Sequence, residues 1–189
     1  MGIPGWVHVE NAVAAVALYV LAARAEGKSV DFDALRAALS GFEGVKRRFE
    51  FYVNTPKAVY MDDYAHHPRE LSAAITSVSK MFPGRKLTAV FQPHLYTRTR
   101  DLYEEFAQAL SLADEVVLLP IYPAREQPIE GITTQIIAQR VTAPCTIVER
   151  EELAAYIAQA ESDVVVTFGA GNIDACCAAV AEVVAKKAE

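Results

Sequence analysis

Short apolar runs alternate with longer amphipathic stretches along most of this chain. The runs are rich in β-branched residues and lie at residues 86–91, 115–119, 145–148 and 163–168. Continuous apolar runs are typical of strands buried on both faces, and helices between them are typical of parallel pairing. The pattern predicts an α/β domain with a mostly parallel sheet that helices cover on both faces.

Helical spacing of apolar positions fills the segments between these runs. It predicts helices at residues 68–81, 99–113, 133–141, 151–160 and 171–186. Pro68 stands at the first helical position of the first of these, where its missing N–H costs nothing. Helices and strands are therefore expected to alternate from Pro68 onwards.

An initial β-hairpin is predicted ahead of the parallel strands. Two strand-like runs at residues 48–53 and 58–61 flank a turn at residues 54–57 that contains Asn and Pro. The hairpin would deliver the polar residues 62–67 to one end of the sheet.

The first part of the chain has a different pattern. Residues 11–25 are rich in Ala and Val and predict a helix that Gly27 ends, and a second helix with an Asp cap is expected at about residues 31–39. The first helix is small and apolar nearly all round, so it needs a surface to pack against. We expect a helical segment at residues 1–44 and a sheet domain at residues 45–189.

Composition narrows the class of protein. The net charge of −6 over 189 residues argues against general nucleic-acid binding, which requires a basic surface. The three cysteines, two of them adjacent, suit neither a metal knuckle nor an easy disulfide. The longest apolar run, residues 12–23, is shorter than the roughly 20 residues a bilayer needs, and no basic segment of a signal peptide precedes it. A cytoplasmic protein is expected.

The polar stretches that core packing does not explain follow the predicted strands. They lie at residues 62–67, 92–100, 120–126 and 169–172. In an open parallel sheet, ligands bind beyond the carboxyl ends of the strands, and these ends share one edge. The sequence therefore predicts a binding site at that edge.

The densest of these stretches is the octet at residues 61–68. It allows three interpretations: a turn that caps the following helix, a proton-transfer and ligand-binding site, or a metal site built from Asp62, Asp63, His66 and His67. Adjacent histidines rarely reach one ion together, and neither an HExxH nor an HxH spacing is present. We favour a functional site without a metal.

Basic side chains gather near the same edge of an otherwise acidic chain. They are Arg47, Arg48, His94, Arg98 and Arg100. Because the arginine fork binds carboxylates and phosphates through two hydrogen bonds, an anionic ligand is expected.

Arg98 and Arg100 differ in what else they can do. Arg100 has a ready partner in Asp101 or Glu104 of the predicted helix. Arg98 precedes that helix, and a helix start is electrostatically unfavourable for an unpaired cation. We therefore expect Arg98, rather than Arg100, to bind the ligand.

Two further motifs bear on nucleotide chemistry. Gly169-Ala170-Gly171 allows a close backbone approach to a phosphate, but it serves equally well as a tight strand-to-helix turn without a ligand. The chain contains no G-x-x-x-x-G-K-[ST] loop, which would bind nucleotide phosphates. It also contains no G-x-S-x-G motif, which would mark a serine nucleophile.

Five ordered motifs carry a resemblance to a known family. They cover residues 44–50, 61–68, 91–99, 121–126 and 169–173, and the match runs from about Gly2 to the end of the chain. The chain resembles the C-terminal part of the MurC-type Mur ligases, which join L-alanine to UDP-N-acetylmuramate in peptidoglycan precursor synthesis.

The resemblance implies how the chain is organised. Mur ligases have a UDP-substrate domain, a central ATPase domain with a P-loop, and a C-terminal Rossmann-like domain of the dinucleotide-binding type. Residues 1–44 would be the last helices of the central domain and residues 45–189 the whole C-terminal domain. The N-terminal domain and most of the central domain would then be missing, and the fragment alone would be inactive.

The family reaction uses ATP and Mg²⁺ to convert the muramate carboxylate into an acyl phosphate, which the amine of L-alanine attacks. By resemblance, the nucleotide-binding residues are Asn11 near the adenine, Arg48 by the phosphates and Asp63 on the ribose or phosphate side. Mg²⁺ would be held mainly by the nucleotide and the missing domain.

The substrates would lie against a second group of residues. By resemblance, Tyr64, His66, His94 and Arg98 line the muramate and alanine region, with His66, His94 and Arg98 as the catalytic residues, while His67 orients the turn.

The chain departs from the family pattern at two places. Val7-His8 stands where His-Asn is frequent, next to the adenine contact, and Leu95 replaces a basic residue. The second change leaves more of the anion binding to Arg98.

Three other functions compete with this one. A related ligase that recycles murein tripeptide shares the octet, but the motif at residues 91–99 favours the alanine-adding enzyme. A non-catalytic anion-binding module of the same fold is supported by the absent P-loop. A metal-dependent phosphoesterase depends on the Asp and His residues of the octet alone.

Overall fold

The computed structural model describes residues 6–42 and 44–189, and the side chains from His8 onwards. The chain forms two compact units, of which the first ends at Lys46 and the second runs from Arg47 to Glu189. Each unit is described separately.

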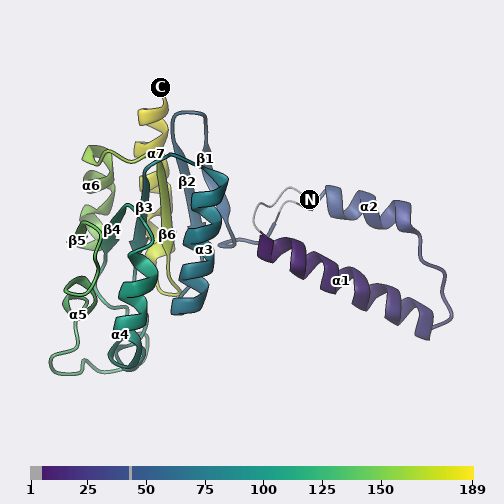
Figure 1. Cartoon of the computed structure of the whole chain (residues 1–189), viewed down its shortest axis with the longest axis horizontal. Helices are drawn as coiled ribbons and strands as arrows, with labels where there is room; N and C mark the ends of the chain where they lie inside the picture. The colour runs from purple at the N-terminus through teal and green to yellow at the C-terminus, as the bar shows by residue number, and fades with distance from the viewer. Residues whose placement is uncertain (1–5, 43) are drawn as a thin grey trace. The chain divides into compact units, whose positions relative to one another are not determined.

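The described residues of the first unit contain two helices (Figure 1). Helix α1 (Trp6–Ala25) begins earlier than the predicted residue 11, and the chain turns at Gly27 with a φ of 68°. Helix α2 (Phe32–Ser40) is capped by Asp31, whose carboxylate accepts hydrogen bonds from two backbone N–H groups of the first turn. No helix in the described part of the chain has both the length and the apolar character to cross a membrane.

The second unit is built on a six-stranded sheet with the order β1-β2-β6-β3-β4-β5. Only the hairpin pair β1–β2 is antiparallel, and the other neighbouring strands are parallel. The predicted fold, a mostly parallel sheet with an initial hairpin, is confirmed. The strands are β1 (Glu50–Asn54), β2 (Val59–Asp63), β3 (Leu87–Phe91), β4 (Glu115–Leu118), β5 (Cys145–Ile147) and β6 (Val164–Phe168).

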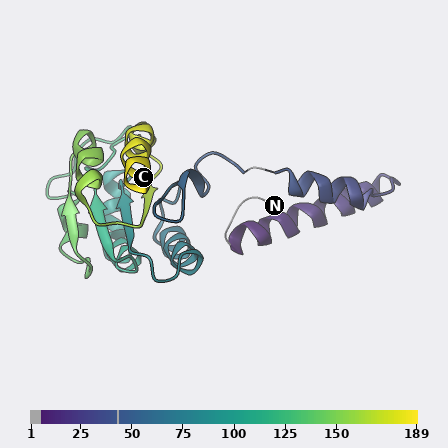
Figure 2. The ribbon, with the colours of Figure 1, turned by 90° about the horizontal axis from the view of Figure 1, so that it is seen from above.

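Helices cover both faces of this sheet, as Figure 2 shows from above. The helical segments are α3 (Pro68–Met81), α4 (Tyr96–Leu110), α5 (Gln135–Ala138), α6 (Leu153–Gln159), α7 (Cys177–Ala188) and two 3₁₀ turns, η1 (Arg150–Glu152) and η2 (Ile173–Cys176). Helices α3, α4 and α5 pack on one face and α6 and α7 on the other.

Three helices differ from the prediction. Helix α4 begins at Tyr96 rather than residue 99, so Arg98 belongs to its first turn instead of preceding it. Helix α5 is a single turn, shorter than the predicted residues 133–141, and the last helix starts as the 3₁₀ turn η2. The helix signal in apolar spacing is weakest for such short elements.

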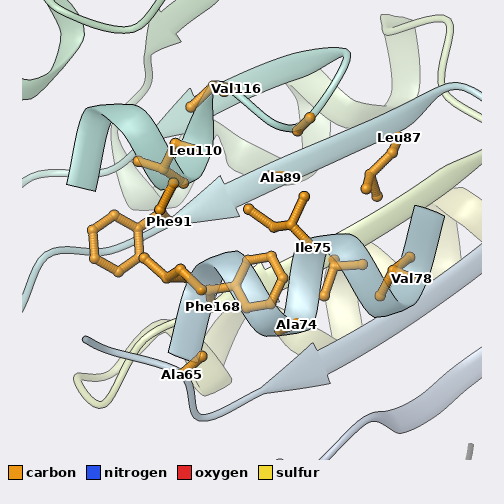
Figure 3. Packing of buried hydrophobic residues seen from close by; sticks show 14 of the residues in the cluster. Ala65, Ala74, Ile75, Val78, Leu87, Ala89, Phe91, Leu110, Val116 and Phe168 are labelled. Atoms are coloured by element: carbon orange, nitrogen blue, oxygen red, sulfur yellow. The ribbon is translucent and has the colours of Figure 1, made fainter. Parts of the chain in front are cut away.

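The core consists of two layers on either side of the sheet. In β6, Val164, Val166 and Phe168 face α3 and α4, whereas Val165 faces α7. Figure 3 shows the first layer, in which Ile75 of α3 packs among residues of β3 and β6. Every residue of β2, β3 and β6 is buried, so apolar residues of these strands occupy both faces of the sheet. The polar residues buried among them are Asp62, Asp63, Thr88 and Thr167.

Replacing Ile75 by Ala is expected to lower the free energy of unfolding by about 2–5 kcal/mol, because its fully buried side chain would leave a cavity. Urea unfolding followed by circular dichroism measures this. Leu112→Ala is the matched control, since Leu112 is 53% exposed and should change stability little. Equal losses in the two variants would contradict the assignment of Ile75 to the core.

Candidate functional site

The carboxyl ends of β2, β6 and β3 lie side by side because β6 pairs with both of the other strands. The loop after β4 joins them through a bridge between His94 and Tyr122. The structure therefore brings the polar stretches that follow these strands to one edge, as the sequence predicted.

Asp62 and Asp63 end β2 and face opposite sides of the sheet. Asp62 is fully buried and accepts hydrogen bonds from Arg47 Nε at 2.8 Å and from Thr167 Oγ1 at 2.7 Å. Burial raises the pKa of the Asp62 carboxyl, against the effect of the hydrogen bonds from Thr167 and Arg47. The Asp62 carboxylate is therefore bonded within the protein and is not accessible to a ligand.

The Asp63 carboxylate is 5% exposed and accepts hydrogen bonds from the backbone N–H groups of Phe49 at 3.0 Å and Ala65 at 2.9 Å. Burial raises the pKa of Asp63 as well, opposed by these two hydrogen bonds. The bond to Ala65 closes an Asx-type turn, so part of the capping interpretation of the octet holds. The two aspartates do not form a joint acid–base pair. Among the residues that the structure describes, no group of three or more His, Cys, Asp or Glu side chains is arranged to hold a metal ion.

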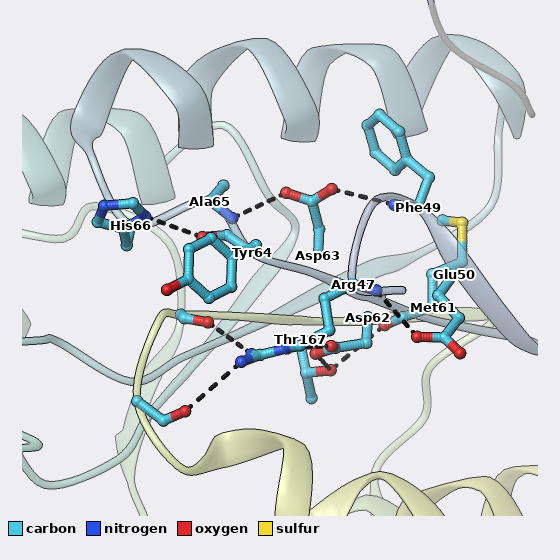
Figure 4. Close-up of polar contacts among 12 residues, drawn as sticks. Arg47, Phe49, Glu50, Met61, Asp62, Asp63, Tyr64, Ala65, His66 and Thr167 are labelled. Atoms are coloured by element: carbon cyan, nitrogen blue, oxygen red, sulfur yellow. Dashed lines mark hydrogen bonds and ion pairs between the residues drawn. The ribbon is translucent and has the colours of Figure 1, made fainter. Parts of the chain in front are cut away.

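Arg47 occupies the centre of the polar contacts in Figure 4. Besides Asp62, its guanidinium donates to the carbonyl oxygens of Gly169 at 2.5 Å and Gly171 at 3.5 Å. Its backbone carbonyl accepts a hydrogen bond from the N–H of Tyr64 at 2.7 Å. One residue therefore joins the start of the second unit to the turns that follow β2 and β6.

Tyr64 lies between two cations and an imidazole. The guanidinium groups of Arg47 and Arg48 are 5.1 Å and 5.8 Å from the centroid of its ring. The ring of His66 meets it edge-on at 5.2 Å, and His66 Nδ1 is 3.0 Å from the carbonyl oxygen of Tyr64. Arg48 is exposed, and the phenol and the imidazole are both partly accessible.

His67 caps helix α3. Its ring accepts a hydrogen bond from the N–H of Arg69, while Glu70 accepts from the N–H of His67 in return. The orienting role expected of His67 is confirmed, and Glu70 is a further residue of this turn that the sequence analysis did not single out.

His94 and Tyr122 connect the loops after β3 and β4. Their rings stack at 5.7 Å, and the ring of His66 approaches His94 at 6.5 Å. We call the four side chains that follow one another along the edge the aromatic rim: Tyr64, His66, His94 and Tyr122.

Two polar atoms in the loop before α4 and in its first turn have no hydrogen-bond partner among the described residues. They are the buried atoms Nδ1 of His94 and Nη1 of Arg98. Burial lowers the pKa of His94, and the neighbouring Arg98 and His66 lower it further, which favours the neutral imidazole. A neutral imidazole beside a guanidinium favours an anionic group or a carbonyl oxygen as ligand. Arg100, in contrast, is paired with Asp101 at 2.7 Å, as expected.

The backbone at the start of α4 is tightly turned. Leu95 has a φ of 74°, and its N–H donates to the carbonyl oxygen of Tyr122. Thr97 donates its hydroxyl and backbone N–H to Glu126, which lowers the pKa of that carboxyl. These contacts hold the loop after β4 against α4.

Gly169 and Gly171 are explained by contacts within the protein. Gly169 has a φ of 145°, and a Cβ there would lie 2.9 Å from the carbonyl oxygen of Gln92. At Gly171 a Cβ would lie 2.5 Å from Gln92 Oε1 and 2.8 Å from Tyr122. The amide of Gln92 donates to Asn172 at 2.9 Å. Of the two interpretations left open, these contacts support the tight turn.

The predicted site residues are thus distributed over both units. Tyr64, His66, His94, Arg98, Arg48 and Asp63 lie at the carboxyl edge of the sheet in the second unit, whereas Asn11 lies exposed on α1 in the first. The nucleotide role of Asn11 stays a prediction. Sequence reasoning missed Tyr122 and Gln92 as individual residues, although both lie in the stretches placed at strand ends.

The fold is that of a dinucleotide-type α/β domain, in which polar turns meet beyond the carboxyl ends of the parallel strands. Residues 47–171 match the family described as Mur ligase, glutamate ligase domain, so the chain belongs to the Mur ligase family through its C-terminal domain. The resemblance drawn from the motifs is confirmed.

Several proteins of this family are similar to nearly the whole chain. The UDP-N-acetylmuramate–L-alanine ligase of Parabacteroides distasonis is 46% identical over 188 residues, which cover 99% of this chain and 39% of that protein. The enzyme of the same name from Cytophaga hutchinsonii is 49% identical over 174 residues, 90% of this chain and 36% of that protein. The crystal structure of UDP-N-acetylmuramate-alanine ligase from Thermotoga maritima matches with a TM-score of 0.73 and 30% identity, covering 95% of this chain and 38% of that one. The chain thus spans less than two fifths of the length of these relatives.

The lowered pKa of His94 is testable by titration. Arg98→Ala removes a nearby positive charge and is expected to raise the pKa of His94 toward its ordinary value of 6.5. NMR titration of ¹³C-labelled histidine in the 189-residue chain measures this. Arg100→Ala, which removes an exposed and already paired charge, is the control and should leave the midpoint of His94 in place. An unchanged midpoint in Arg98→Ala would show that the charge of Arg98 does not act on His94.

Proposed function

We propose that this chain acts as the C-terminal part of an ATP-dependent, amide-forming ligase that joins L-alanine to UDP-N-acetylmuramate. The observation that carries the proposal is 46% identity over 99% of the chain to a relative named for that reaction. In this reaction ATP activates the muramate carboxylate as an acyl phosphate, which the amine of L-alanine attacks. The setting is cytoplasmic peptidoglycan precursor synthesis for the cell wall.

The aromatic rim and Arg98 supply the substrate side of this proposal. The unpartnered atoms of His94 and Arg98 are suited to binding a carboxylate or an activated carbonyl oxygen. His66 and Tyr64 extend the same surface and are both partly accessible. Positioning the amine against the activated carbonyl is the main task of such a site.

The nucleotide side is supported by Arg48. Its guanidinium is exposed above Tyr64, and the described residues give it no ion pair, so it remains available to phosphate oxygens. Asp63 would act through the turn that it closes with Phe49 and Ala65 rather than as a free carboxylate. Asn11 would contact the adenine.

Mg²⁺ is proposed to be held mainly by the nucleotide and by the domain of the complete ligase that this chain does not contain. Asp62 and Asp63, the two carboxylates at the end of β2, are both buried and hydrogen-bonded within the protein. The Asp and His residues of the octet therefore give no support to a metal-dependent phosphoesterase.

In the complete ligase, Arg98→Ala is expected to lower kcat/KM by about 100-fold or more, because it removes a donor from a partly buried anion site. A coupled assay of ADP release with L-alanine and UDP-N-acetylmuramate measures the loss. Arg100→Ala changes the same charge two residues away and should keep nearly full activity. Full activity of Arg98→Ala would remove Arg98 from the site.

The 189-residue chain alone is expected to show no ATP turnover with these substrates and at most weak nucleotide binding, since it has no P-loop. Phosphate release and isothermal titration with ATP test the two parts. Turnover by the chain alone would contradict its assignment as one part of a larger active site.

A further inference from the structure

Arg47 differs from the other cations at the edge of the sheet because its guanidinium is directed into the protein. Each of its three nitrogens donates to a protein oxygen: Nε to Asp62 at 2.8 Å, Nη2 to Gly169 at 2.5 Å and Nη1 to Gly171 at 3.5 Å. Its side chain is only 16% exposed. Arg47 is therefore poorly placed to bind a ligand directly.

The same side chain reaches both ends of the aromatic rim. At one end its guanidinium lies 5.1 Å from the ring centroid of Tyr64. At the other end it holds the carbonyl of Gly171, the residue that packs so closely on Tyr122 that a Cβ would lie 2.8 Å away. Arg47 therefore contacts Tyr64 at one end of the rim (Figure 4) and the turn that packs on Tyr122 at the other.

The backbone of Arg47 is fixed as firmly as its side chain. It has a φ of 59°, its N–H donates to Glu50 at 2.9 Å, and its carbonyl oxygen accepts from the N–H of Tyr64 at 2.7 Å. A non-glycine residue at positive φ persists where surrounding contacts determine its conformation. Tyr64 is therefore tied to Arg47 through both the backbone and the ring.

We propose that Arg47, with Asp62 as its buried counter-ion, is a positioning residue for the ligase reaction proposed above. It fixes Tyr64 relative to the turn at Gly169–Gly171 and so sets the spacing of the aromatic rim without touching a substrate. The catalytic consequence rests on the proposed function, whereas the geometric one is measurable in this chain alone.

A purely structural role for the ion pair makes a different prediction. Replacing a buried ion pair by neutral groups of similar volume is often neutral for stability, whereas removing one partner leaves an uncompensated charge. The double variant Arg47→Met/Asp62→Asn therefore keeps the fold and the net charge but loses the bonds to Gly169 and Gly171. If the pair only stabilises the fold, the rim stays as it is.

The test uses histidine ring signals in the 189-residue chain, which has four histidines. Proton–carbon NMR spectra are recorded at about pH 8.5, where imidazoles with an ordinary pKa near 6.5 are neutral. In the double variant the signals of His66 and His94 are expected to shift or broaden. Those of His8 in the first unit and of His67, the cap of α3, should stay and so report an intact fold.

Two single variants sharpen the result. Arg48→Met removes the other cation above Tyr64 but no bond to the turn, so the displacement of His66 and His94 should be smaller. Arg47→Lys keeps the charge opposite Asp62 but lacks the planar fork, so it should displace both signals, and it replaces the double variant should that fail to fold.

The complete ligase provides the second measurement. The double variant is expected to lower kcat by about 10- to 100-fold with a smaller change in KM, because misplaced groups slow the reaction more than they weaken binding. Unmoved signals of His66 and His94 would overturn the proposal, and so would displaced signals with unchanged kcat. If the wild-type ligase does not add L-alanine, the proposed function is wrong. The NMR result on the position of His66 and His94 would still hold.

Discussion

The pairing of β6 with both β2 and β3 is the constraint on which the candidate site depends. It places the carboxyl ends of three parallel strands side by side, so the turns that follow them meet at one edge. The apolar alternation of β6 then lets α3 and α4 pack on one face and α7 on the other. The same strand therefore serves both core layers and the site.

Thr167 shows how the core and the site are connected. It occupies a fully buried position of β6, where its hydroxyl donates to Asp62 and lies 3.1 Å from the hydroxyl of Tyr60. A buried carboxylate is costly unless it is paired and hydrogen-bonded, and Thr167 and Arg47 together meet that need. The polar groups inside the sheet thus continue without interruption to the turn at Gly169.

Local signals made much of this fold predictable. Helix α3 has the predicted ends, because Pro68 at its start and Pro83-Gly84 after its end act on the backbone within a few residues. The hairpin, the parallel strands and the shared edge also follow from apolar patterns and turn residues. Short elements such as α5 were less well predicted, since one helical turn contains too few apolar positions to define a period.

The candidate site was predictable in its location but not in its internal contacts. Ending β2 at residue 61 left Asp62 and Asp63 in one loop, where they suggested joint chemistry, whereas the strand extends to Asp63 and its alternation turns them to opposite faces. The partners of Arg47 at Gly169 and Gly171 lie more than 120 residues away in the sequence, beyond the reach of any local pattern. Arg98 was expected to bind the ligand because an unpaired cation is unfavourable at a helix start, and His94 was assigned by resemblance; both roles stay predictions.

The position of β6 in the chain also has a consequence for folding during synthesis. Strands β2 and β3 are made early but do not pair with each other, and the strand that separates them is residues 164–168. Until these residues have left the ribosome, the edges of β2 and β3 that pair with β6 in the folded domain have no partner. Exposed strand edges invite pairing with other chains, and non-local pairings form slowly. The domain is therefore most exposed to misassembly just before its last strand and helix emerge.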